Sequence, residues 1–478
     1  MKALLRISSD IMTKAAKTRA RFTRRLAANL RAALEGEGIS GSVTRDHVRL
    51  YLESDDERAF EAARRIFGVH SVSPCLEEPF TSFDALIARG VDIFAERVRG
   101  RSYAVRAKVR GEHAFGSQQV NETLGGALMP FGAVKLTRPE VTVQIELRGG
   151  VARFYTERLP AVPGLPLGVE GRGVLLLSGG FDSAVAAWLA MRRGVSLDYV
   201  FCRLGGPAHE RAVLPIANHL QSQWSAGASS RLFVVPFEAV AEMLGARVSE
   251  RMRQLVLKQL MYRVAASIAR FVHAEAIFTG ESLGQVSSQT LKNLRALEAP
   301  ENVPIHRPLL THTKEEIIAL AREIGTHDLS VSVPEYCALV PRHPATGASR
   351  RETRDATALM SFDPWEAAHL AERLDLPAPV PMAGFREEVD EIPDGALVLD
   401  IRPPELYEAW HPSGARLVEA ASLSADPLGI PRDQSCVIVC QFGLRSSWVA
   451  RNLRRQGFDA LSLRGGASRF APQQKPSD

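Results

Sequence analysis

The sequence predicts a multidomain protein of α/β and α+β type, with a doubly wound parallel sheet as its main domain. From residue 173 onward, apolar strands alternate with helices, which is typical of a parallel sheet covered by helices on both faces. A length of 478 residues is sufficient for three or more domains. A composition of 45% hydrophobic and 24% charged residues excludes disordered and fibrous proteins.

The first 159 residues predict two small α+β domains, over 1–58 and 59–159. Phe22, Leu26, Leu30 and Leu34 recur at every fourth position, which indicates an amphipathic helix. The full set of expected elements is a strand at 2–7, a helix at 12–35, a strand at 43–53, helices at 58–69 and 82–98, and strands near 103–110 and 140–155.

Three further segments follow these domains. The proline and glycine content of 160–172 predicts a linker. The parallel-sheet domain is expected over 173–345, and a charged, then proline-rich connector over 346–384. A short α/β module is expected over 385–474, because it begins with the apolar strand 396–400.

Basic residues are concentrated near the N-terminus. Residues 1–50 hold eleven Lys or Arg against four Asp or Glu. Arg106, Lys108 and Arg110 alternate with apolar residues, which predicts a strand with one cationic face. A polyanion such as RNA is the natural partner of such a surface. A solvated strand face without a partner is the alternative.

Compartment and metal content can also be predicted. No stretch approaches about 20 uncharged apolar residues, and the apolar core of the N-terminal segment is too short for a signal peptide. We therefore expect a cytoplasmic protein. The five cysteines form no CxxC pair and no dense framework, so an important cysteine is expected to be catalytic or redox-active. Cys75, Cys202 and Cys436 are expected to be structural. The histidines lack zinc-binding spacing, and we expect no structural metal.

A glycine-rich loop joins the first strand of the parallel sheet to an alanine-rich helix. The strand 174–177 leads into Ser178-Gly179-Gly180-Phe181-Asp182-Ser183, and the helix covers 184–190. Two glycines allow successive N–H groups to converge, and the helix dipole adds positive potential, so the loop is suited to phosphate oxygens. Asp182 can position Mg²⁺, and the serines can donate to phosphates. Neither GxxxxGK[ST] nor GxGxxG is present, and a glycine turn before a capped helix is the alternative.

A second loop of this type contains a cysteine. The strand 437–439 leads into Cys440-Gln441-Phe442-Gly443-Leu444-Arg445-Ser446 and then into a helix at 447–456. The surrounding N–H groups, Arg445 and the helix dipole favour a thiolate at Cys440, which can carry a persulfide. A buried structural cysteine is the alternative. Cys337, two residues after Glu335, is a weaker candidate on its chemistry alone.

Several motifs resemble known families. The SGGxDS loop resembles that of the PP-loop ATP pyrophosphatases, which adenylate a carbonyl oxygen and release pyrophosphate. The segments 280–290 and 334–337 resemble motifs of the tRNA 4-thiouridine synthetases, the tRNA sulfurtransferases that also serve thiamin biosynthesis. The CxxxxR loop, together with 399–407, resembles the rhodanese family. The similarity covers nearly the whole chain and implies a ferredoxin-like domain, a THUMP domain for RNA, the ATP domain and a rhodanese-like domain.

The resemblance also implies roles for individual residues. On their own, Lys258 and Lys314 would be ordinary surface lysines. The family pattern implies an ATP site made of Leu176, Leu177, Ser178, Gly179, Gly180, Asp182, Ser183, Lys258, Gly280, Gln289 and Lys314. It implies a persulfide loop made of Cys440, Gly443, Arg445 and Ser446, and a redox-active disulfide between Cys337 and Cys440.

The implied activity is ATP- and Mg²⁺-dependent transfer of persulfide sulfur to tRNA, forming 4-thiouridine. The position of the uridine, residue 8 of the tRNA, follows from the family alone. A cysteine desulfurase is the implied sulfur donor. A thiamin sulfur carrier as a further partner and a homodimer are compatible with the family, and the sequence leaves both open. Whether the persulfide itself or sulfide released from it attacks the uridine stays open.

Two other functions compete with this interpretation. Another PP-loop ligase would adenylate a small molecule and use ammonia, and it would not need a basic N-terminal region or a rhodanese-like loop. A non-enzymatic RNA-binding or sulfur-carrier protein would keep the cationic strand or Cys440 but would not need Asp182. Exchange of pyrophosphate into ATP that depends on added tRNA would distinguish the three.

Overall fold

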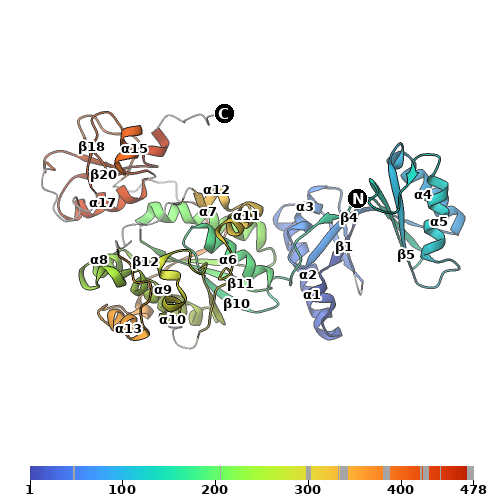
Figure 1. Cartoon of the computed structure of the whole chain (residues 1–478), viewed down its shortest axis with the longest axis horizontal. Coiled ribbons are helices and arrows are strands. Elements are labelled where there is room, and N and C mark those ends of the chain that lie inside the picture. The colour runs from blue at the N-terminus through green and yellow to red at the C-terminus, as the bar shows by residue number, and fades with distance from the viewer. Residues whose placement is uncertain are drawn as a thin grey trace. The chain divides into compact units, whose positions relative to one another are not determined.

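The computed structural model describes residues 1–46, 49–204, 206–297, 303–331, 333, 343–380, 388–419, 423, 430–441 and 443–470 (Figure 1). The chain forms two compact units. The first contains Met1–Glu170 with the short segments Met191–Val195 and Gln223–Ala228, and the second contains the rest. The predicted multidomain α/β and α+β class is confirmed.

The first unit is built on a nine-stranded sheet. Its elements are β1 (Lys2–Ile7), α1 (Ser9–Met12), α2 (Ala16–Gly36), β2 (Ser42–Arg45), β3 (Arg49–Glu53), α3 (Arg58–Arg64), β4 (Val69–Pro79), α4 (Phe83–Val98), β5 (Ser102–Arg110), α5 (Ser117–Leu128), β6 (Ala133–Val134), β7 (Val141–Arg148), β8 (Val151–Tyr155) and β9 (Leu159–Pro160). The strand order is β2-β3-β1-β4-β8-β7-β5-β6, and β9 also pairs with β4.

Strand β4 joins the two halves of this sheet. Its first part pairs antiparallel with β1, in a register that matches Lys2 with Cys75, and its last four residues pair antiparallel with β8. Phe60 and Val72 lie in the same buried core as Leu26 of α2. Residues beyond the expected boundary at 58 therefore complete the N-terminal core, although the irregular polar segment 54–57 separates α3 from β3.

The second half of the first unit has its own core, in which α4 and α5 pack on β5 and β7. In β5, Tyr103 and Val105 are buried, whereas Arg106, Lys108 and Arg110 are exposed. The alternation predicted for this strand is confirmed. The segment 160–172, expected to be a linker, is also packed, because Leu165 and Leu167 are buried.

The second unit contains a six-stranded sheet in the order β14-β13-β10-β11-β12-β15. Its elements are β10 (Arg172–Leu176), α6 (Phe181–Arg192), β11 (Ser196–Arg203), α7 (Gly206–Trp224), β12 (Arg231–Pro236), α8 (Glu238–Arg247), η1 (Glu250–Met252), α9 (Arg253–Phe271), β13 (Ala276–Phe278), η2 (Ser287–Gln289), α10 (Leu291–Ala296), β14 (Ile305–His306), α11 (Lys314–Glu323), α12 (His327–Val331), α13 (Arg350–Ala358), α14 (Pro364–His369) and β15 (Glu372–Asp375).

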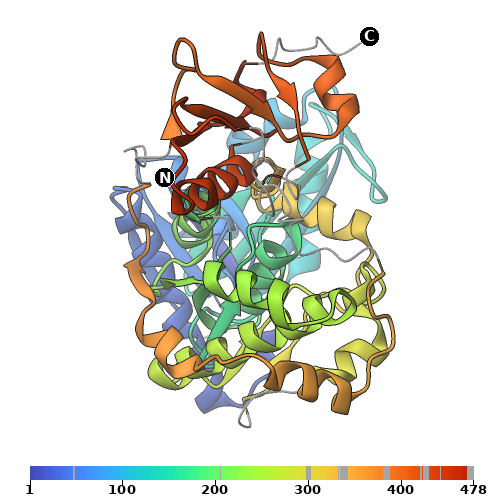
Figure 2. The same ribbon diagram turned by 90° about the vertical axis from the view of Figure 1, so that its left-hand side faces the viewer.

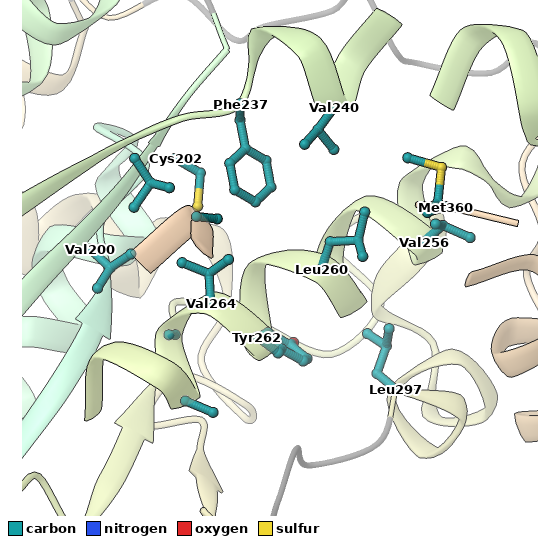
Figure 3. Packing of buried hydrophobic residues seen from close by; sticks show 14 of the residues in the cluster. Val200, Cys202, Phe237, Val240, Val256, Leu260, Tyr262, Val264, Leu297 and Met360 are labelled. Atoms are coloured by element: carbon teal, nitrogen blue, oxygen red, sulfur yellow. The ribbon is translucent and has the colours of Figure 1, made fainter. Parts of the chain in front are cut away.

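All neighbouring strands from β14 to β12 are parallel. Val200 of β11 shares one buried cluster with Val256, Leu260 and Val264 of α9, which recur at every fourth position of that helix. In Figure 3, Val264 is the one of the three that lies beside Val200. Tyr199 points to the opposite face of the strand and is also fully buried. Both faces of the sheet are therefore covered, and the predicted doubly wound sheet is confirmed.

The segment 346–384, expected to be a connector, contains α13, α14 and β15. Strand β15 pairs antiparallel with β12, so it forms one edge of the six-stranded sheet. The buried side chains of α13 are Thr353 and Thr357. Because that face carries threonines and no large apolar residues, hydrophobic periodicity gave no signal for this helix.

The C-terminal module forms a five-stranded parallel sheet in the order β16-β20-β19-β17-β18. Helix α17, red in Figure 2, packs on β19 and β20. The elements are β16 (Glu388–Val389), β17 (Leu397–Asp400), α15 (Pro404–Ala409), β18 (Arg416–Leu417), β19 (Cys436–Val439), α17 (Leu444–Arg455), β20 (Ala460–Leu463) and α18 (Ala467–Phe470). The expected strand at 396–400 and the helix after Cys440 are both present.

Candidate active site

The glycine-rich loop lies where the strand order of the six-stranded sheet reverses. From β10 the chain proceeds to β11 and β12 on one side, and later returns to β13 and β14 on the other. In open α/β sheets, ligands bind in the crevice beyond the carboxyl ends of the strands at such a reversal. The loops that follow β10 and β13 are therefore the expected walls of a site.

The loop after β10 is held by its own hydroxyl groups. Ser183 Oγ donates to the Gly180 carbonyl over 3.0 Å and accepts from the Ser178 backbone N–H over 3.2 Å. Gly179 has φ +88°, and a Cβ there would lie 2.8 Å from the side chains of Val213 and Val333. Helix α6 begins at Phe181, so its positive end adjoins this loop. The arrangement is suited to binding phosphate oxygens.

A cavity of about 280 Å³ adjoins the loop. This volume is near the lower end for ligand pockets, which hold roughly 300–1,000 Å³. Burial lowers the pKa of His209, at its wall, to about 4, so this histidine is neutral at physiological pH. The lining combines polar loop residues with apolar walls: Leu176, Leu177, Ser178, Gly180, Asp182, Val200, Phe201, Cys202, Leu204, His209, Met261 and Val333. A purine base against the apolar wall and phosphates against the loop would match this division.

Gly280, expected in the site, lies directly against the loop. A Cβ at this position would be 2.6 Å from the Asp182 carbonyl carbon and from the Ser183 backbone nitrogen. Gln285, from the same segment, donates to Asp182 Oδ2 over 3.1 Å. Asp182 offers one half-buried carboxylate beside the predicted phosphate positions, and Mg²⁺ commonly uses one or two carboxylates together with substrate phosphates. Asp182 thus fits the expected magnesium ligand.

Lys258 is joined to the site through a residue that the sequence did not indicate. Its Nζ donates to Glu281 Oε1 over 2.8 Å. Glu281, which follows Gly280, also accepts from Arg307 Nε over 2.7 Å. Burial by itself would raise the pKa of Glu281, but Lys258 and Arg307 lower it to about 2. The sequence contained one signal for Glu281, which is an acidic residue directly after Gly280 in the motif at 280–290.

The two other expected nucleotide residues have different surroundings. Gln289 is buried in η2, and its Oε1 accepts from the Ser282 backbone N–H over 3.2 Å, so it braces the segment after β13. Lys314 is exposed in the first turn of α11. It forms no hydrogen bond or ion pair with any residue that the structure describes.

The cysteine loop has the same order of strand, loop and helix. Cys440 Sγ accepts from the Ser446 backbone N–H over 3.3 Å and lies 3.2 Å from Ser446 Oγ. Ser446 Oγ in turn lies 2.8 Å from Ser462 Oγ, and Ser462 donates to the Gly443 carbonyl over 3.2 Å. With α17 beginning at Leu444, the sulfur has a helix N-terminus, one backbone N–H donor and one hydroxyl group beside it. A helix N-terminus with a backbone donor is a setting in which reactive cysteines are found.

A buried ion pair supports the base of this loop. Arg402 Nη2 donates to Asp400 Oδ2 over 2.7 Å at the end of β17. Arg402 Nη1 also lies 3.5 Å from Oε1 of Gln441, the residue after the cysteine. The sequence motif around 399–407 was noticed for its resemblance, but this bracing role was not predicted.

Several other predicted features have partial or no structural description. Cys337 lies outside the described residues, as does the side chain of Arg445. Arg106, on the cationic strand, donates to the Leu136 carbonyl over 2.7 Å. Within the described ranges, no group of three or more His, Cys, Asp or Glu side chains is arranged to hold a metal ion. No helix in the described part of the chain is long and apolar enough to span a membrane.

Comparison with protein families gives four matches in succession. They are the ThiI ferredoxin-like domain over residues 2–73, the THUMP domain over 80–157, thiamine biosynthesis protein (ThiI) over 168–362 and the rhodanese-like domain over 385–473.

Similar full-length proteins are known. A tRNA sulfurtransferase from Pyrobaculum aerophilum is 37% identical, with 98% of this chain and 97% of that protein covered. One from Desulfurococcus amylolyticus is 35% identical, with 98% of both covered. A crystal structure of a 4-thiouridine synthetase–RNA complex with bound ATP has a TM-score of 0.66 and 27% identity, covering 78% of this chain and 99% of that one.

Proposed function

Since the chain belongs to the tRNA sulfurtransferase family, we propose that it uses ATP to transfer sulfur carried by Cys440 to a uridine of tRNA, forming 4-thiouridine. The observation that carries this proposal is the pairing of two anion-binding loops in one chain. One is a phosphate cradle without a nucleophile, and the other surrounds a cysteine. Activation of an oxygen and delivery of sulfur need these two parts.

The first step is adenylation of the uridine. With ATP phosphates against the loop of Ser178 and Ser183, O4 of the uracil attacks the α-phosphorus. The O4–phosphorus bond forms, the bond between the α-phosphorus and the β-phosphate oxygen breaks, pyrophosphate leaves, and the N3 proton of the uracil passes to solvent. Mg²⁺ held by Asp182 would offset the charge of the phosphates. The uracil oxygen then departs with AMP, which is a far better leaving group.

The second step transfers sulfur. The terminal sulfur of a Cys440 persulfide attacks C4, AMP leaves, and C4 is joined to Cys440 through a disulfide. A thiolate at Cys337 attacks Cys440 Sγ, which forms the Cys337–Cys440 disulfide and releases the C4 thiolate. Attack of Cys337 before C4 is reached would release hydrosulfide as the nucleophile, with the same final disulfide. An external dithiol reduces the enzyme.

The proposed steps require a sulfur donor and a tRNA substrate. A cysteine desulfurase supplies the persulfide sulfur, and the tRNA binds along the exposed cations Arg106, Lys108 and Arg110 of β5. Uridine 8 of the tRNA, a homodimeric assembly and sulfur transfer to a thiamin sulfur carrier remain proposals that rest on family resemblance. A cytoplasmic location remains a proposal that rests on the pattern of apolar residues in the sequence. Replacement of the three cations should reduce the slope of log K against log salt by about 0.9 for each phosphate that the protein no longer neutralises.

The test of the proposed function is pyrophosphate exchange into ATP, measured with and without tRNA. We expect exchange only with tRNA, and 4-thiouridine only when a desulfurase and cysteine are also present. A PP-loop ligase of other specificity would exchange pyrophosphate with a small acceptor and no tRNA. A sulfur carrier without enzymatic activity would show no exchange at all. Either result would refute the proposal.

The relay between the cysteines has its own test. After one turnover without reductant, mass spectrometry should detect a peptide pair joined through Cys337 and Cys440. The variant Cys337→Ala should retain persulfide loading but lose multiple turnover. Trapping of tRNA on Cys440 in this variant would indicate direct attack by the persulfide. Two free thiols beside thiolated tRNA would contradict the relay.

A further inference from the structure

Two buried carboxylates lie at opposite ends of the six-stranded sheet. Asp198, near the start of β11, accepts from Arg172 Nη1 over 2.7 Å and from Arg231 Nη2 over 2.6 Å. The two arginines are the first residues of β10 and β12. Asp198 therefore ties together the amino ends of three adjacent parallel strands, away from the carboxyl ends where ligands bind in such sheets.

Glu281 occupies the other end of this sheet, just beyond β13. Its side chain receives four hydrogen bonds, which come from Lys258 over 2.8 Å, Tyr262 over 2.6 Å, Arg307 over 2.7 Å and Thr279 over 3.1 Å. Glu281 is only 5% exposed. One carboxylate thus joins helix α9, the end of β13 and the residue after β14.

The charges in this cluster do not cancel. Lys258 and Arg307 each contribute one positive charge, whereas Glu281 contributes one negative charge, so the cluster keeps one net positive charge. The cations lower the pKa of Glu281 to about 2, against the effect of burial, so the carboxylate is ionised at physiological pH. Arg307 reaches Glu281 through Nε, so this ion pair does not require the two terminal nitrogens of the guanidinium.

The cluster adjoins the phosphate cradle. Gly280, the neighbour of Glu281, leaves no room for a Cβ against the backbone of Asp182 and Ser183. Met261, the neighbour of Tyr262, lines the cavity beside that loop. Glu281 therefore directly follows a residue that contacts the loop, and Lys258 lies three residues, about one helical turn, before the cavity-lining Met261 in α9.

We propose that Glu281 is a positioning residue that holds Lys258 and Arg307 as a cation pair for the nucleotide phosphates, and that Arg307 is an additional phosphate-binding residue. This inference rests on the proposed function, which assigns the cavity to ATP. Without the carboxylate, two cations would be left in a partly buried site with no counter-charge. Their side chains would move apart and into solvent, and the donors would no longer converge on the phosphates.

The test compares Glu281→Gln with Asp198→Asn, a matched control that also removes one buried carboxylate shared by two cations. ATP affinity is measured by calorimetry, tRNA affinity by filter binding, and stability by thermal melting. Both variants should melt at a lower temperature. Only Glu281→Gln should weaken ATP binding, by roughly 10- to 100-fold for a charge-assisted contact, and tRNA affinity should stay unchanged in both.

A double-mutant cycle identifies the cause. In a Lys258→Met background, Glu281→Gln should weaken ATP binding much less than in the parent protein, because the cation that it positions is absent. Arg307→Met should weaken ATP binding by itself. If Glu281→Gln fails to fold, Lys258→Met and Arg307→Met still decide the question, since each leaves the carboxylate paired with the other cation.

The outcomes separate this inference from the proposed function. If the parent protein binds no ATP, the proposed function fails. If the parent binds ATP but Glu281→Gln binds it equally well, the positioning role is wrong and the proposed function stands. Equal weakening by Asp198→Asn would show a general effect of stability and would overturn the inference. Unchanged ATP binding by Arg307→Met would remove the phosphate-binding role of Arg307.

Discussion

The loops after β10 and β19 share a backbone design but differ in the group that carries the chemistry. Each follows a strand of a parallel sheet, precedes a helix and contains a glycine in the left-handed region, with φ +88° at Gly179 and +83° at Gly443. The first loop begins with Ser178, whose hydroxyl lies 3.2 Å from that of Ser183. The second begins with Cys440, whose sulfur receives a hydrogen bond from Ser446.

The difference shows how one backbone arrangement serves two anions. Converging N–H groups and a helix N-terminus attract negative charge of any kind. In the first loop the anion must arrive from solution, so a cavity of about 280 Å³ lies beside it. In the second the group beside the N–H donors is a side chain of the protein, and Cys440 is only 6% exposed. The residue at the start of the loop decides which anion is held.

The largest expected effect comes from removing the sulfur. The variant Cys440→Ala should lose all persulfide loading by a desulfurase, measured as sulfane sulfur released by cyanide, and should form no 4-thiouridine. Cys436→Ala is the matched control, because Cys436 is buried on the preceding strand and faces the core. It should lower thermal stability but load sulfur normally. Persulfide on the Cys440→Ala protein would show that another cysteine is the carrier.

Removal of the charge from the first loop should have the next largest effect. Asp182→Asn should slow tRNA-dependent pyrophosphate release by roughly 10²–10³-fold, as expected when one group that stabilises transition-state charge is removed. Persulfide loading should stay normal, because Cys440 does not depend on this carboxylate. Cys440→Ala should show the reverse pattern, with normal pyrophosphate release. If both variants lose both activities, the two loops do not act independently.

The third prediction concerns the space around the first loop. Gly280→Ala should destabilise the protein by about 1–3 kcal/mol, the usual range for overpacking, because its Cβ would collide with the backbone of Asp182 and Ser183. Gly245→Ala is the control. It lies in α8 with nothing within 4 Å of a new Cβ, so it should be neutral or add up to about 1 kcal/mol of stability. Urea unfolding measures both, and equal effects would contradict the close contact.

The smallest effect is expected from the hydroxyl beside the sulfur. Ser446→Ala keeps the backbone donor to Cys440 but removes Oγ, so alkylation of the reduced protein by iodoacetamide should slow by about 2- to 10-fold, the effect of one hydrogen bond. Ser462→Ala acts through Ser446 Oγ and should slow alkylation less. A larger effect from Ser462→Ala would mean that this serine contacts the sulfur directly in solution.

Sequence reasoning reached the backbone of both loops because their motifs are local. Strand, glycine turn and helix follow one another within about fifteen residues, so their order is visible in the chain. Glu281 was missed because its partners Lys258 and Arg307 come from separate elements. These segments meet only because α9 packs on β13 and β14 pairs with β13, and no local pattern records that packing.

The same reason explains the error at 346–384. Two helices and an edge strand were expected to be a connector, because their packing partners lie far earlier in the chain, about 100 residues for α9 and about 140 for β12. By contrast, α2 was predicted well, since its four-residue periodicity of Phe22, Leu26 and Leu30 reports burial directly. Local periodicity predicts which face is buried, but it does not identify the element against which that face packs.

Strand β4 has a consequence for how the first unit comes apart. Its residues are hydrogen-bonded to β1 at one end and to β8 at the other, so neither half of the sheet can detach without leaving an unpaired edge on its neighbour. Amide hydrogens of β1 and β8 should therefore exchange with solvent in one shared opening event, with a common free energy. A chain cut within β4 would divide this strand between two fragments, so each fragment would lack part of the strand that pairs with its sheet.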